Sequence, residues 1–78
     1  MLDTVRKAGG KLGVNGVLMV WYICSRSQYV AVDTYEVEVY LIDVIQEQVF
    51  HSKMNFLDTG RAISTVFDQF FAAYGIAG

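Results

Sequence analysis

The 78-residue sequence contains no proline, one cysteine and one histidine, and each scarcity excludes a class of structure. Without proline, low-complexity tracts or repeats, no segment has the composition of a linker, so we predict one small domain over residues 1–78. Cys24 has no partner for a disulfide within the chain and is expected to be a small buried hydrophobe. One cysteine and one histidine cannot fill a tetrahedral zinc shell, and no acidic loop has calcium spacing. We therefore expect neither a metal nor a cofactor.

Long hydrophobic runs are also missing. The longest uninterrupted apolar stretch, Val17–Cys24, has the length of a strand and is too short to cross a membrane as a helix. No charged segment followed by an apolar one marks a secretory signal peptide. The sequence predicts no transmembrane segment and, by default, a cytoplasmic protein.

What the chain does have is an excess of apolar residues for its size. Hydrophobic residues make up 54% of the sequence, with five Tyr, five Phe and one Trp. A domain this small buries only about 60% of the surface that its unfolded chain exposes. Part of the apolar surface is therefore expected to face another molecule, and we predict a homodimer, with an unidentified protein partner as the alternative.

Two segments have helical spacing. A short amphipathic helix is expected over residues 2–12, weakened by its internal glycines, with Gly13 taking the left-handed conformation that ends it. A longer helix near the end of the chain has apolar residues at i, i+3, i+4, i+7, i+8 and i+11 from Ile63. Asp58 or Thr59 is expected to cap it and Gly75 to end it. Its buried stripe is expected to centre on Phe67.

Between the helices, hydrophobic alternation predicts three strands, at residues 17–24, about 29–44 and 49–56. In the second strand the apolar residues change from even positions (Val30, Val32) to odd positions, which predicts a β-bulge near residues 33–34. In the third, even-numbered residues as far as Phe56 are expected to face the core. The order α-β-β-β-α predicts an α+β domain, a three-stranded antiparallel meander with helices packed on one face.

Three segments carry a distinctive order of small turns and apolar strands: Leu12-Gly13-Val14-Asn15-Gly16-Val17-Leu18, Val39-Tyr40-Leu41-Ile42-Asp43 and Val49-Phe50-His51-Ser52. Over residues 8–56 the chain resembles the carboxy-terminal half of the bacterial envelope domain of TolB amino-terminal domains, curli-secretion lipoproteins and penicillin-binding-protein activator lipoproteins. It departs from that pattern in a turn at residues 45–48 without glycine and in His51, where the family favours an aromatic residue.

The resemblance implies an interaction module and not an enzyme. The amino-terminal strand and helix of the family's domain have no counterpart here, which suggests a shortened domain. Their absence would leave a bare sheet edge, and a second copy of the chain could cover such an edge.

Six residues are candidates for an interface or a groove: Trp21, Tyr22, Glu36, Glu38, Tyr40 and His51. The aromatic residues could line a groove or centre a protein contact on the sheet face away from the helices, with core packing as the alternative. The two glutamates share one face of a strand, as a pair of carboxylates at a site or as an ordinary solvated surface. The histidine would need a catalytic partner, and Cys24 could serve only if the strands brought the two together. We assign no catalytic residue.

Three functions are compatible with the sequence. The leading one is a small non-catalytic binding or scaffold module that acts as a homo-oligomer through an exposed sheet face or edge. The alternative is a double-stranded-RNA-binding-like module, which has the same element order. Nucleic acid is disfavoured because the pI is near 5.0 and the last helix begins with Arg61 as its single basic residue. The third is a small-ligand or enzyme site at a dimer seam, for which a polar pocket holding His51 or the two glutamates would be needed.

Overall fold

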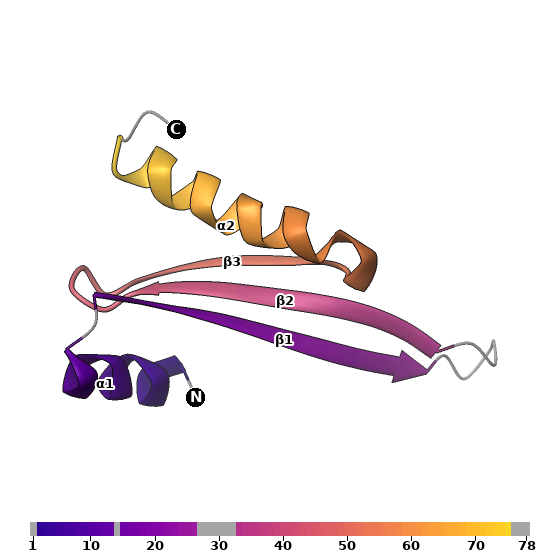
Figure 1. Ribbon diagram of the computed structural model, residues 1–78, viewed down its shortest axis with the longest axis horizontal. Helices are drawn as coiled ribbons and strands as arrows, with labels where there is room; N and C mark the ends of the chain where they lie inside the picture. Colours follow the sequence, from indigo (N-terminus) through magenta and orange to yellow (C-terminus); the bar gives the residue numbers. More distant parts are fainter. Residues whose placement is uncertain (1, 14, 27–32, 76–78) are drawn as a thin grey trace.

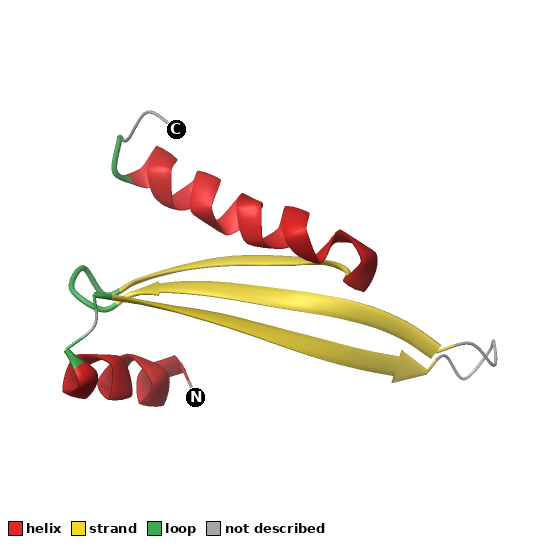
Figure 2. Ribbon diagram, viewed as in Figure 1, coloured by secondary structure: helices red, strands yellow, loops and turns green. Residues whose placement is uncertain are grey.

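The computed structural model describes residues 2–13, 15–26 and 33–75. Within them the chain forms two helices, three strands and one 3-10 turn (Figures 1 and 2): α1 (Leu2–Leu12), β1 (Gly16–Arg26), β2 (Asp33–Asp43), β3 (Gln48–Asn55), η1 (Phe56–Asp58) and α2 (Thr59–Ala73). The strands make one antiparallel sheet in the order β1-β2-β3. The predicted α+β class and element order are confirmed.

Alternation along β2 divides the sheet into two faces. Val39 lies opposite Val20 of β1 and Ser52 of β3, and directly opposed residues in an antiparallel pair share a face. This face packs against α2, which lies along β3 and β2 (Figure 1). The resulting core consists of residues from β2, β3 and α2: Val37, Val39, Leu41, Phe50, Ala62 and Val66. The Ser52 hydroxyl is buried there and donates to the Ala62 carbonyl at 2.7 Å, so the one polar group in this core is satisfied.

The amino-terminal helix α1 contacts β1 and lies beyond it, on the opposite side of the strands from α2 (Figure 1). Only α2 therefore packs on the core face. Gly13 ends α1 with a φ of 73°, as predicted, and its N–H donates to the Gly10 carbonyl at 3.2 Å. This turn, held by a bond from the Val44 N–H to the Asn15 carbonyl at 3.0 Å, directs the chain into β1 at the sheet edge remote from α2.

The predicted β-bulge does not occur at Asp33 and Thr34. Asp33 pairs with Arg26 and Thr34 with Ser25, one residue to one, and the register continues unbroken to the other end of β1. Ser25 and Arg26 are accordingly strand residues, whereas the gap between the first two predicted strands is expected to form a turn at residues 25–28. Residues 27 and 28 of the expected turn, and residues 29–32 of the expected second strand, lie outside the described part of the chain. At the end of β3, Phe56 belongs to η1 and is exposed, so it does not face the core as expected.

The buried line of α2 differs from the one predicted. Ala62 and Val66, one turn apart, are fully buried, whereas Phe67 is 36% exposed. Successive helical residues are about 100° apart, so a helix that rests on β3 and β2 through Val66 turns Phe67 toward the uncovered part of the sheet. Asp58 occupies the N-cap position, but its side chain makes no capping hydrogen bond. Gly75 has a φ of 66° just beyond α2, in agreement with its predicted role.

The molecule is flat and extended. Its Cα atoms span 44 × 30 × 14 Å with a radius of gyration of 14.8 Å. A compact domain of this length has a radius of gyration of about 11.5 Å. One helix covering two of three strands produces this shape, because β1 adds width to the sheet without adding a second layer.

Candidate functional site

The sheet face away from α2 collects five of the six predicted site residues. Trp21 lies opposite Glu38, and Tyr40 opposite His51, while Glu36 is two residues from Glu38 and so on the same face. Tyr22 is the exception, since it lies opposite Val37 and belongs to the α2 face of β1. Of the aromatic residues expected on the face away from the helices, Trp21 and Tyr40 thus lie on the face away from α2 and Tyr22 does not.

Contacts on this face join the polar side chains to one another. Lys53 places its Nζ 3.8 Å from Glu36 Oε2 and 3.7 Å from Glu38 Oε1. The Tyr40 hydroxyl donates to Glu38 Oε2 at 2.9 Å, and this hydrogen bond, followed by desolvation, raises the pKa of Tyr40. Both carboxylates are thus held by a neighbouring cation, as on an ordinary solvated strand surface.

His51 is exposed and stacks on Tyr40, with ring centroids 4.5 Å apart and an interplanar angle of 24°. Cys24 lies on the other face of the sheet. It is opposite Tyr35 of β2, whereas His51 is opposite Tyr40, five residues farther along the same strand. The two residues therefore do not form a thiol–imidazole pair. Cys24 is exposed and not buried as predicted, because it lies on β1 outside the cover of α2. Among the described residues, no group of three or more His, Cys, Asp or Glu side chains could hold a metal ion.

Strand β1 is an edge strand with uncovered apolar side chains on its α2 face. Leu18 is 44% exposed and Tyr22 is 67% exposed. Both lie on the face that, at β2 and β3, forms the core with α2. β1 has β2 as its neighbour on one side, and no described strand pairs with its other side. The N–H and C=O groups of alternate residues of β1 point away from β2, so backbone groups without a strand partner and an apolar strip meet at one edge.

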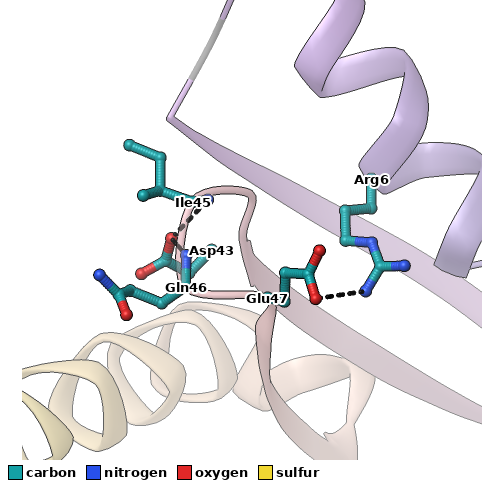
Figure 3. A network of polar contacts seen from close by, with 5 residues as sticks. All are labelled: Arg6, Asp43, Ile45, Gln46 and Glu47. Atoms are coloured by element: carbon teal, nitrogen blue, oxygen red, sulfur yellow. Dashed lines mark hydrogen bonds and ion pairs between the residues drawn. The ribbon is translucent and has the colours of Figure 1, made fainter.

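The turn between β2 and β3 is organised by a carboxylate that sequence reasoning did not single out (Figure 3). Asp43 Oδ1 accepts hydrogen bonds from the N–H groups of Ile45 and Gln46, both at 2.9 Å. Glu47, the last residue of the turn, has a left-handed backbone conformation with a φ of 56°, which glycine adopts more easily. Its Oε2 lies 4.0 Å from Arg6 Nη1. An Asp directly before a four-residue turn is the sequence signal that could have identified this arrangement.

Asp43 also connects the turn to α2. The Tyr74 hydroxyl donates to Asp43 Oδ2 at 2.6 Å, between residues 31 positions apart in the sequence. The hydrogen bond from the Gln46 N–H is the largest cause that lowers the pKa of Asp43, and the bond from Tyr74 is the second. In return, the hydrogen bond to Asp43 raises the pKa of Tyr74 to about 12.

This pair predicts a distinctive alkaline titration. Because the folded-state pKa of Tyr74 is raised above the ordinary value of 10, its stabilising effect is complete below pH 10 and is lost as the pH rises through about 12. We expect tyrosinate absorbance to show one group titrating near pH 12, and Tyr74→Phe to remove it. Tyr22→Phe, at an exposed position, is the matched control and should leave that step in place. An unchanged step in Tyr74→Phe would contradict the assignment.

A hollow of about 390 Å³ opens beside this pair, between the second half of α2 and the turn end of the sheet. Its walls are mostly apolar, and its lining comes from the β1 entry, β2, the turn and α2: Asn15, Gly16, Leu41, Ile42, Asp43, Ile45, Gln46, Phe67, Phe70 and Tyr74. None of the residues predicted for a dimer-seam site, His51, Glu36 or Glu38, lines it. The hollow is thus a separate feature from the polar sheet face.

Comparison of the chain with protein-family models, curated proteins and solved structures finds no match. The resemblance to the bacterial envelope domain therefore stays a prediction. In the part of the chain that the structure covers, no helix is both long enough and apolar enough to span a membrane.

Proposed function

We propose that the protein is a small non-catalytic binding or scaffold module that acts as a homodimer through the edge of β1. One observation carries the proposal. No described strand pairs with the outer side of the long edge strand β1, and the apolar side chains of Leu18 and Tyr22 are exposed on it, while α1 contacts β1 near its beginning (Figure 1). Exposed, long and apolar edge strands pair readily with another strand, and proteins that remain monomeric usually protect them.

The total surface supports a partner of considerable size. The chain exposes 5480 Å², whereas a compact monomer of 8.7 kDa exposes about 4,700 Å². The excess is of the same order as the roughly 800 Å² that each partner buries in a standard protein interface. If dimerisation buried this excess, the exposed area of each chain would be close to that of a compact monomer of the same mass.

A two-fold symmetric pair of β1 strands would have a defined arrangement of faces. A two-fold axis perpendicular to the sheet makes the two strands antiparallel and keeps the same face of both copies on the same side. Leu18, Val20 and Tyr22 of both copies would then share one face of a six-stranded sheet, between two α2 helices. The apolar strip that a single α2 leaves open would become the floor between two helices.

The edge is a better candidate than the open sheet face. On that face Glu36 and Glu38 are paired with Lys53, and Tyr40 donates to Glu38, so burying the face would remove several charges from water. Pairing at β1 would instead bury apolar side chains and satisfy backbone groups.

Neither alternative function gains support from a specific observation. An RNA-binding module needs a basic surface where the last helix begins, and Arg61 is the single basic residue of α2. A catalytic or polar ligand site at a dimer seam needs a pocket around His51 or the two glutamates, and the hollow lies elsewhere.

Solution mass tests the proposal directly. At micromolar concentration, sedimentation equilibrium of the full chain is expected to give twice the monomer mass of 8.7 kDa. Dilution should convert the dimer reversibly to monomer, because a single interface of standard size gives a measurable dissociation constant. A monomer at all concentrations up to the millimolar range would refute self-pairing.

A further inference from the structure

The hollow between α2 and the β2–β3 turn combines an apolar wall with one carboxylate. Leu41 is buried and lines the hollow, as do the rings of Phe67 and Phe70 of α2 and of Tyr74, the C-cap residue of that helix. Asp43 stands at the turn end of the same hollow. A volume of about 390 Å³ is at the small end of the range for ligand pockets, roughly 300–1,000 Å³.

Asp43 keeps its charge and one hydrogen-bonding position. A carboxylate has about four acceptor positions, and three are used here by Ile45, Gln46 and Tyr74. Those three donors are neutral groups, and no described cation lies within ion-pair distance of Asp43. The other acidic residue at this end of the sheet, Glu47, differs because its Oε2 lies 4.0 Å from Arg6 Nη1.

The aromatic rings favour the same kind of ligand. Phe70 and Tyr74 are in edge contact with centroids 4.7 Å apart, and Phe67 closes the wall nearer the middle of α2. Aromatic faces attract cations, and they also bury the apolar body of a ligand. An anionic ligand would meet the Asp43 carboxylate with like charge, and a neutral apolar ligand would leave that charge unpaired.

We propose that this hollow binds a small organic cation with an apolar body, an aromatic or short alkyl amine. The ammonium group donates to the open position of Asp43, and the apolar body lies against Leu41, Phe67 and Phe70. The site is made within one copy of the chain, so its occupancy does not depend on self-association.

Titration of the full chain with three matched ligands tests the proposal. Calorimetry and amide chemical shifts are followed with 2-phenylethylamine, the neutral 2-phenylethanol and the anionic phenylacetate at neutral pH. The amine is expected to bind at least about tenfold more tightly than the alcohol, and phenylacetate more weakly than both. Equal affinity for amine and alcohol, or no binding of the amine at millimolar concentration, would overturn the proposal.

A pair of variants in the same turn identifies the charge that is responsible. Asp43→Asn keeps a side-chain oxygen for the Ile45 and Gln46 N–H groups but removes the charge, and should abolish the preference for amine over alcohol. Glu47→Gln removes one negative charge from the same turn, at a residue that does not line the hollow. It should leave the preference unchanged. Unchanged preference in Asp43→Asn, or its loss in Glu47→Gln, would contradict the assignment.

The unaltered protein provides a test that does not depend on the folding of a variant. Amine binding is expected to shift the amide signals of Ile45 and Gln46 and the ring signals of Phe70 and Tyr74. Shifts confined to the open sheet face around Trp21 and Glu38 would place the ligand elsewhere and overturn the proposal.

Discussion

Replacing Phe50 with alanine is expected to lower the free energy of unfolding by about 3–5 kcal/mol, the usual cost of removing a buried phenylalanine. Phe50 is buried between β3 and α2, with ring centroids 5.8 Å from Phe70 and 6.2 Å from Tyr74. A chain of 78 residues has a total stability of roughly 4–12 kcal/mol. The variant should therefore be largely unfolded or close to it, as measured by urea denaturation followed by circular dichroism.

Phe67→Ala is the matched control, because it deletes the same atoms from the same type of residue. With its side chain 36% exposed at the margin of α2, the cost should be no more than about 1–2 kcal/mol. The large difference between the two variants depends on α2 resting on β3 and β2 through Ala62 and Val66. Equal costs would mean that the buried line of α2 is wrongly placed.

The periodicity of the chain was sufficient to predict which elements form. The last helix, its end at Gly75 and the end of the first helix at Gly13 depend on local spacing and on backbone conformation. Local spacing does not specify which of several adjacent apolar residues faces the sheet, and Phe67 and Val66 are neighbours. Which of the two residues is buried depends on the position of α2 over the three strands, and that position is determined by the whole fold.

The candidate site was predictable to a similar extent. Strand parity places Glu36, Glu38 and Tyr40 on one face once β2 is recognised. In β1, alternation alone places Trp21 and Tyr22 on opposite faces, but β1 is apolar on both faces, so only the register with β2 shows that Tyr22 is the one on the α2 face. The contact between Asp43 and Tyr74 joins residues 31 positions apart, so no local pattern could reveal it.

Both the edge of β1 and the hollow have a common structural origin. A single helix cannot cover three strands, and α2 lies toward β3. Leu18 and Tyr22 on the α2 face of β1 are left open as a result, and the side of α2 nearest to them carries Phe67, which borders the hollow. The exposed apolar residues at the edge of β1 and beside the hollow thus follow from the same incomplete cover of the sheet.

Placing lysine at both Leu18 and Tyr22 is expected to raise the dissociation constant of the proposed homodimer by at least about 100-fold. Charged side chains, lysine above all, prevent edge strands from pairing, and a two-fold interface would bring four ammonium groups together. Since the two side chains are 44% and 67% exposed, the substitutions should change the free energy of unfolding of the monomer by less than about 1 kcal/mol. Sedimentation equilibrium measures the first quantity and urea denaturation the second.

Leu57→Lys provides the control for this loss of association. Leu57 is 79% exposed on η1, so the variant removes an exposed leucine and adds a positive charge without altering β1. It should dimerise like the unaltered chain. If Leu57→Lys dissociates the dimer and the β1 double variant does not, the interface lies on η1, and the open edge of β1 is not what joins the two copies.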